Sequence, residues 1–147
     1  MRRESVSHQI YAAVNNHQAK HKSMVVESSY TLNHINVKIL FDYGATDSFI
    51  SPSALERSGL AAYEHDEFKQ VEMASGEKQE VGPSVYNCII DLGVCTTRFK
   101  VYVIALGTYD LIIGMEWLES HRAMVDCFAK RALCVDDDKR LVEIHGV

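Results

Sequence analysis

The chain has 147 residues, 47% of them hydrophobic and 24% charged, which is the composition of an ordinary globular protein. A chain of this length forms one domain and buries roughly two-thirds of the surface that its unfolded form exposes. The formal net charge of −5 argues against a nucleic-acid-binding protein. No run approaches the ~18 apolar residues of a membrane span, and no apolar stretch follows Arg2-Arg3 as a signal peptide requires. We therefore expect an intracellular protein without nucleic-acid or membrane partners.

The four cysteines contain no C-x-x-C pair. They form two pairs, each separated by seven residues, and a disulfide between such residues depends on geometry that spacing does not supply. Without a secretory signal we expect reduced, partly buried thiols. The residues are Cys88, Cys95, Cys127 and Cys134.

Residues 1–23 differ from the rest of the chain in composition and charge. They are polar, rich in His, Asn and Lys, and carry a formal charge of +3, whereas the remainder carries −8. Val6, Ile10 and Ala13 follow a loose helical spacing that extends to His17 and predicts a short amphipathic helix. We expect this segment to be a linker or N-terminal arm, and residues 24–147 to form the structured domain.

The pattern changes to that of β-strands at Met24. Apolar and polar side chains alternate up to Leu32, and Asn33-His34 predicts a two-residue hairpin turn because Asn tolerates positive φ. The returning strand ends at Asp42. Its inward-facing positions are Ile35, Val37, Ile39 and Phe41.

Short helices and further strands follow. Ser51-Pro52 predicts a helix start and Gly59 its end. Residues 68–74 and 78–91 predict two strands joined at Ser75-Gly76. Residues 111–113 are apolar on both faces, as in a central strand, and residues 116–121 predict a short helix. Two strands around the acidic turn 136–138 end the chain, so many closely spaced short strands predict a mainly β, closed fold.

The stretch 39–50 is the most informative part of the chain. An apolar strand runs directly into Asp42, and a Gly-Ala turn follows. A charge at the end of a buried strand is costly unless it has a partner or a chemical role. The stretch 109–118 has a similar build: an apolar strand, a glycine and a short helix. Asp42 by itself could be a turn residue that accepts local backbone hydrogen bonds. For Asp110 and Asp126 we predict structural carboxylates that accept hydrogen bonds from backbone amides.

Together these stretches resemble the retropepsin-like aspartic proteases of long-terminal-repeat retrotransposons, the gypsy type in particular. The similarity covers roughly residues 24–147 and rests on the ordered combination of motifs, because Asp-x-Gly alone occurs in many tight turns. It implies a closed barrel with a flap hairpin and one or two short helices. The motifs are Asp42-x-Gly44-Ala45-Thr46, Ser48-Phe49-Ile50-Ser51, Ala74-Ser75-Gly76 and the run 109–118.

The resemblance implies an aspartic endopeptidase that processes a retrotransposon polyprotein. Because the chain holds one such turn, the second carboxylate must be Asp42 of another copy in a homodimer. Two carboxylates in contact share one proton, and the pair activates a water that attacks the scissile peptide carbonyl. No metal or cofactor is implied. The resemblance assigns peptide binding to Gly44, Ala45, Thr46, Asp47, Ala74, Ser75, Gly76 and Ile112.

Tyr43 departs from the family pattern, which places Ser or Thr between the aspartate and the glycine. In the family that hydroxyl bonds to the partner subunit's backbone beneath the catalytic pair. A phenol is bulkier, and overpacking a tight site typically costs ~1–3 kcal/mol. Two interpretations therefore stay open: an active enzyme that tolerates Tyr43, and a catalytically impaired module that acts in dimerisation or peptide binding.

Overall fold

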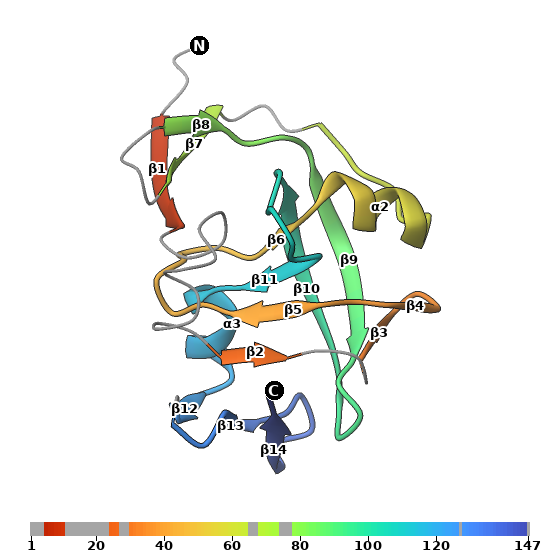
Figure 1. Ribbon diagram of the computed structural model, residues 1–147, viewed down its shortest axis with the longest axis vertical. Coiled ribbons are helices and arrows are strands. Elements are labelled where there is room, and N and C mark those ends of the chain that lie inside the picture. Colours follow the sequence, from red (N-terminus) through yellow and green to blue (C-terminus); the bar gives the residue numbers. More distant parts are fainter. Residues whose placement is uncertain are drawn as a thin grey trace.

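An eight-stranded, curled sheet forms the body of the protein (Figure 1). In this computed structural model the described residues are 5–10, 24–26, 30–64, 68–73, 78–126 and 128–146. The strands of the large sheet are β2 (Met24–Val26), β3 (Thr31–Leu32), β4 (Ile35–Asn36), β5 (Ile39–Phe41), β6 (Phe49–Ile50), β9 (Ser84–Asp91), β10 (Thr96–Val103) and β11 (Leu111–Ile113). They lie in the order β2-β5-β11-β6-β10-β9-β3-β4. The predicted mainly β fold is confirmed.

Two smaller sheets lie at opposite ends of this body (Figure 1). One, which we call the flap sheet after the flap hairpin that the resemblance implies, consists of β1 (Ser5–Ile10), β7 (Phe68–Met73) and β8 (Lys78–Glu80). The C-terminal sheet consists of β12 (Met124–Asp126), β13 (Arg131–Val135) and β14 (Leu141–His145). Two short helices, α2 (Pro52–Ser58) and α3 (Met115–Ser120), complete the described elements.

The centre of the large sheet is built by β11. It runs parallel to β5, with Ile113 opposite Phe41, and antiparallel to β6. All three of its residues are buried, as the two-sided apolar pattern predicted. The sheet thus brings the two motif-bearing stretches side by side, although they are about 70 residues apart in the chain.

Local turn and cap predictions are confirmed where the structure describes them. Asn33 and His34 adopt φ of 44° and 74° between β3 and β4, the conformation that a tight hairpin turn requires. The Ser51 side chain accepts a hydrogen bond from Ala54 N–H at the start of α2. Gly59 ends α2 at φ 70°. These features depend on a few neighbouring residues, which is why the sequence predicts them well.

Residues 5–10 form a strand, so the helix predicted from residue 6 is wrong over this range. β1 pairs in parallel with β7 along its whole length. A short isolated helix is marginal in water, whereas strand pairing supplies a partner for its backbone groups. Residues 11–23, the rest of the predicted linker or arm, lie outside the described residues.

Two apolar clusters make up the core. The larger lies between the sheet, α3 and the C-terminal sheet, where Trp117 packs edge-on against Phe41 at 5.9 Å between ring centroids. The Trp117 indole N–H donates to the Thr97 hydroxyl at 2.8 Å. The second, which we call the site-side cluster, consists of Leu40, Ala45, Phe49, Val71, Val81, Tyr102, Ile104, Leu106, Tyr109 and Ile112. It joins the central strands to the flap sheet.

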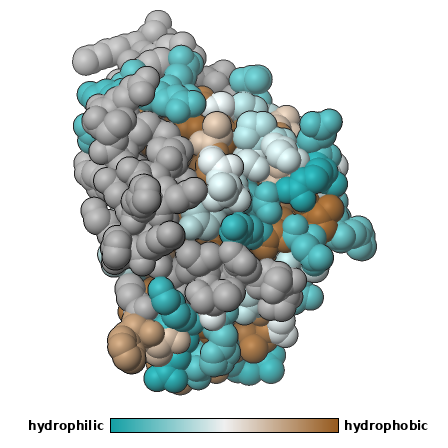
Figure 2. All heavy atoms as spheres, in the orientation of Figure 1, coloured by the Kyte–Doolittle hydropathy of each residue, from teal (hydrophilic) through white to brown (hydrophobic). Residues whose placement is uncertain are grey.

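Polar side chains cover most of the described surface in the view of Figure 2, and apolar side chains gather at a few points. Met124, Phe128 and Leu141, which belong to or adjoin the C-terminal sheet, are among the most exposed large apolar residues. Both described helices are far shorter than a membrane span. None of the helices in the described ranges is long and apolar enough to cross a membrane.

Candidate active site

Asp42 lies directly after β5, in a turn that holds its backbone and side chain. Its N–H donates to Ile113 O at 2.9 Å, and its carbonyl accepts from Ala45 N–H at 3.1 Å. Its Oδ1 accepts from Gly44 N–H at 2.8 Å. The side chain is 1% exposed. The carboxylate therefore has the local turn bond that a structural role predicts.

The turn after Asp42 is clamped by the junction between β11 and α3. Met115 N–H donates to Ala45 O at 2.8 Å, and Glu116 N–H donates to Thr46 O at 3.0 Å. Gly114 N–H donates to the Ser48 hydroxyl at 3.1 Å. A Cβ atom on Gly114 would lie 2.1 Å from Asp47 O, so the close approach requires glycine. The sequence signal for this clamp is the glycine that follows the apolar strand 111–113.

The predicted peptide-binding residues divide by exposure. Thr46 is exposed and Gly44 is half-buried, whereas Ala45, Asp47 and Ile112 are buried. Ala45 and Ile112 belong to the site-side cluster together with Val71 of β7. The flap strand thus packs against the predicted wall of the site. The predicted flap tip, Ala74, Ser75 and Gly76, lies outside the described residues.

Tyr43 is directed to the surface rather than into the turn. It is 46% exposed and lines a hollow of about 480 Å³ together with side chains of α3 and β12. Within one chain, therefore, the phenol does not overpack the site. The other lining residues are Met115, Leu118, Glu119, Arg122, Ala123 and Val125.

Asp110 and Asp126 have the structural roles that the sequence predicted. Asp110 Oδ2 accepts from Lys38 N–H at 2.9 Å, and its Oδ1 accepts from Arg57 Nη2 at 2.6 Å. Asp126 Oδ1 accepts two backbone N–H groups, those of residues 128 and 129, at 3.1 and 3.0 Å. Each carboxylate closes a turn or joins a loop to a helix.

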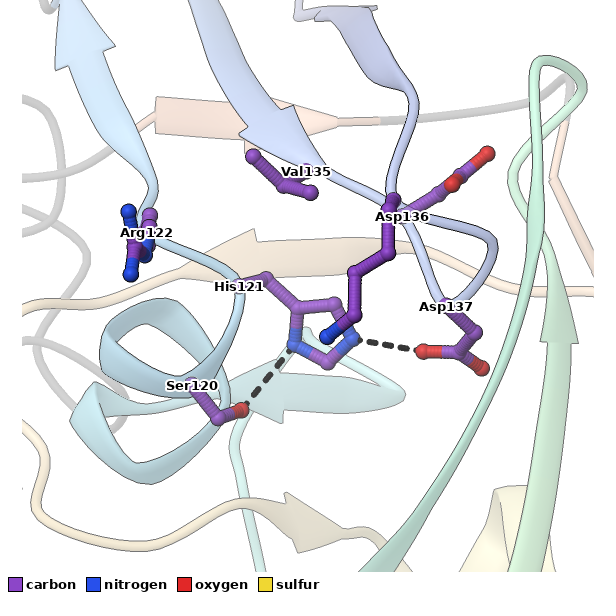
Figure 3. A pocket seen from close by; sticks show the side chains of 7 residues that line it. Ser120, His121, Arg122, Val135, Asp136 and Asp137 are labelled. Carbon is purple, nitrogen blue, oxygen red and sulfur yellow. Dashed lines mark hydrogen bonds and ion pairs between the residues drawn. The ribbon is translucent and has the colours of Figure 1, made fainter.

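A serine, a histidine and an aspartate meet beside a second hollow, of about 570 Å³ (Figure 3). His121 Nε2 lies 2.9 Å from Asp137 Oδ1, and its Nδ1 lies 3.1 Å from Ser120 Oγ. The sequence carries no local signal for this group, because Asp137 is 16 residues away from the histidine.

The surroundings of His121 argue against nucleophilic catalysis at Ser120. His121 Nδ1 also lies 3.0 Å from Trp117 O, so this nitrogen is not aimed at the serine hydroxyl alone. The Ser120 hydroxyl itself donates to Trp117 O at 3.0 Å. The imidazole stacks on the Trp117 ring at 4.1 Å between centroids. This group fastens the turn 136–138 to the end of α3.

The described cysteines, Cys88, Cys95 and Cys134, are free thiols, as predicted; Cys127 lies outside the described residues. Burial raises the pKa of Cys88 to about 12. Burial, with a smaller effect of Cys95, raises the pKa of Cys134 to about 11. The part of the chain that the structure describes contains no group of three His, Cys, Asp or Glu side chains that could hold a metal ion.

Comparison with known proteins places these features in a family. The family model described as retroviral aspartyl protease matches residues 5–140. The protein DDI1 homolog of Leishmania major is 31% identical over 96 residues, which is 65% of this chain and 24% of that protein. The chain thus spans about a quarter of the length of this curated relative.

The crystal structure of the retroviral protease-like domain of Ddi1 from Leishmania major has the same fold, with a TM-score of 0.62. It is 22% identical, and the match covers 86% of this chain and 94% of that domain. Because the family model matches most of its length, this chain belongs to the retroviral aspartyl protease family.

Proposed function

We propose that this chain is an aspartic endopeptidase whose active site forms from the Asp42 carboxylates of two identical copies. The observation that carries the proposal is the position of Asp42. It follows a buried strand, lies in the tight turn 42–45, and is held by the β11–α3 junction. One chain contributes one such turn, so a two-fold axis between two Asp42 side chains completes the pair.

The chemistry of the pair follows from charge repulsion. Two carboxylates in contact share one proton, because both cannot ionise at close range. The ionised member removes a proton from a water held between them, and that water attacks the peptide carbonyl. The protonated member donates a hydrogen bond to the carbonyl oxygen, on which negative charge develops. Gly44 leaves room for the peptide backbone, because it has no side chain.

The substrate class is an extended peptide. Such a peptide gains affinity from backbone hydrogen bonds to the flap strand and specificity from pockets for its side chains. Ile112 is the apolar wall of one pocket, and Thr46 and Asp47 supply polar contacts at its edge. Ala45, Ile112 and Val71 are all fully buried in the site-side cluster, so entry of a peptide along this wall requires the flap sheet to move. The biological role that we propose is retrotransposon polyprotein processing inside the cell, and it rests only on the resemblance of the motifs to those of gypsy-type proteases.

Replacement of Asp42 tests the proposal. Asp42→Asn keeps the size of the side chain but removes the ionisable carboxylate from both copies of the homodimer. No group then accepts the proton of the water, so the rate of cleavage of a peptide library should fall by roughly 10³-fold or more. Asp126→Asn is the matched control, since it removes the same charge from an exposed turn outside the site. Cleavage by Asp42→Asn at the parent rate would rule out the mechanism.

A second candidate is a peptide-binding or dimerising module without turnover. Tyr43 favours it, because its exposed phenol adjoins Asp42 and would lie beside the two-fold axis of the proposed dimer. The hollow beside Tyr43 offers space for the ring, so the side chain obstructs catalysis only if the second copy needs that space. The two candidates share the dimer and differ in turnover.

A further inference from the structure

The flap sheet contains a strand that a flap hairpin does not need. β1 lies beside β7, on the side away from β8, in the order β1-β7-β8 (Figure 1). The two strands run parallel in register over six residue pairs, from Ser5 opposite Phe68 to Ile10 opposite Met73. Both edges of β7 are therefore paired. A paired edge offers no backbone N–H or C=O groups to another strand.

β7 is also the flap strand that faces the site. Val71, in its middle, is fully buried and belongs to the site-side cluster with Ala45 and Ile112. Opposite Val71 in the β1 ladder is His8. The hairpin partner β8 occupies the other edge of β7 over residues 70–72. A peptide that adds to β7 as a strand must consequently use the edge where β1 lies.

Tethering favours this arrangement over binding of a separate peptide. Because β1 belongs to the same chain as β7, its effective concentration at β7 exceeds that of a dilute separate peptide. A separate peptide competes against that concentration.

We propose that residues 5–10 occupy the peptide position on β7, so that the N-terminal arm excludes an extended peptide until it is released. The inference rests on the proposed function, because it takes β7 as the strand that a substrate pairs with. If the arm is docked for about 90% of the time, about one-tenth of the molecules are competent and peptide binding is weakened about tenfold.

The test uses the unaltered full chain, because its probe carries a tetrahedral hydroxyl in place of the scissile carbonyl, binds to the Asp42 pair and is not cleaved. Hydrogen exchange read by mass spectrometry should show protected amides at residues 5–10. Addition of a statine-containing peptide, a mimic of the aspartic-protease transition state, should make these amides exchange faster and leave residues 68–73 protected.

Proline substitutions in β1 then release the arm without touching the site. Alternate N–H groups of a strand point to opposite sides, so one of Ser7→Pro and His8→Pro removes a hydrogen bond to β7. That variant should bind the statine peptide about tenfold more tightly than its parent, as the competent fraction predicts. Unchanged protection of residues 78–80 in β8 is the control that the flap hairpin stays folded.

Equal peptide affinity in the parent and both proline variants would overturn the proposal. So would protection at residues 5–10 that persists when the peptide is bound. Failure of the proposed function has a different signature, namely that no variant binds the peptide while residues 5–10 stay protected. In that case β1 is a structural strand, and the competition is excluded.

Discussion

Gly114→Ala is the substitution that most directly tests how the site is held. The added Cβ atom would lie 2.1 Å from Asp47 O and 2.8 Å from Ala45 O, whereas ordinary contacts begin at 3.4 Å. Both obstacles are backbone atoms, so the turn or the β11–α3 junction must move by roughly 1 Å. The movement would stretch the Gly114–Ser48 and Met115–Ala45 hydrogen bonds.

The magnitude follows from these contacts. Overpacking costs ~1–3 kcal/mol, and two weakened hydrogen bonds add ~0.5–1.5 kcal/mol each. We therefore expect the free energy of unfolding to fall by about 3–4 kcal/mol, a large part of the ~5–15 kcal/mol of a typical domain. A displacement of about 1 Å at Asp42 should also lower the cleavage rate by roughly 10²-fold among molecules that remain folded.

Urea unfolding and peptide cleavage measure the two effects. Gly59→Ala is the matched control, because it also places a methyl group on a glycine. Gly59 has φ of 70° and no atom within 4 Å of the added Cβ. It should lose about 1 kcal/mol through backbone strain alone and keep its cleavage rate. If Gly114→Ala matched Gly59→Ala in both stability and rate, the clamp would have no role in positioning Asp42.

Two further predictions concern Tyr43 and a buried thiol. Tyr43→Ser restores the short hydroxyl of the family. If the phenol obstructs the dimer, its removal relieves an overpacking cost of about 1.4 kcal/mol, and the cleavage rate at mildly acidic pH should rise at least tenfold. An unchanged cleavage rate would show that Tyr43 does not block catalysis. For Cys88, burial raises the folded pKa from 9.0 to about 12, so its contribution to stability is complete below pH 9 and is lost as pH rises toward 12. Between pH 8 and pH 10 the free energy of unfolding, measured with urea, should fall by about 1.4 kcal/mol in the parent protein, and Cys88→Ala should lack this decrease. An identical pH dependence in the parent and in Cys88→Ala would contradict the raised pKa of Cys88.

Several features followed from short stretches of sequence. The hairpin at Asn33-His34, the caps of α2 and the central strand 111–113 each depend on residues that are neighbours in the chain. The same holds for the turn bond between Asp42 and Gly44, which links residues two positions apart. Asp110 shows the limit, since its predicted bond to a backbone amide was correct but its partner, Lys38, lies 72 residues away.

What the sequence alone determined is which residues form strands, turns and caps, and that one carboxylate stands at the end of a buried strand. The tertiary structure decided what surrounds that carboxylate: the clamp of Gly114 on the turn, the surface position of Tyr43 and the pairing of β1 with the flap strand. The physical reason is range. Propensity, turn chemistry and hydrophobic alternation act over a few residues, whereas these contacts join segments some 60 to 70 residues apart, and only the packed chain brings them together.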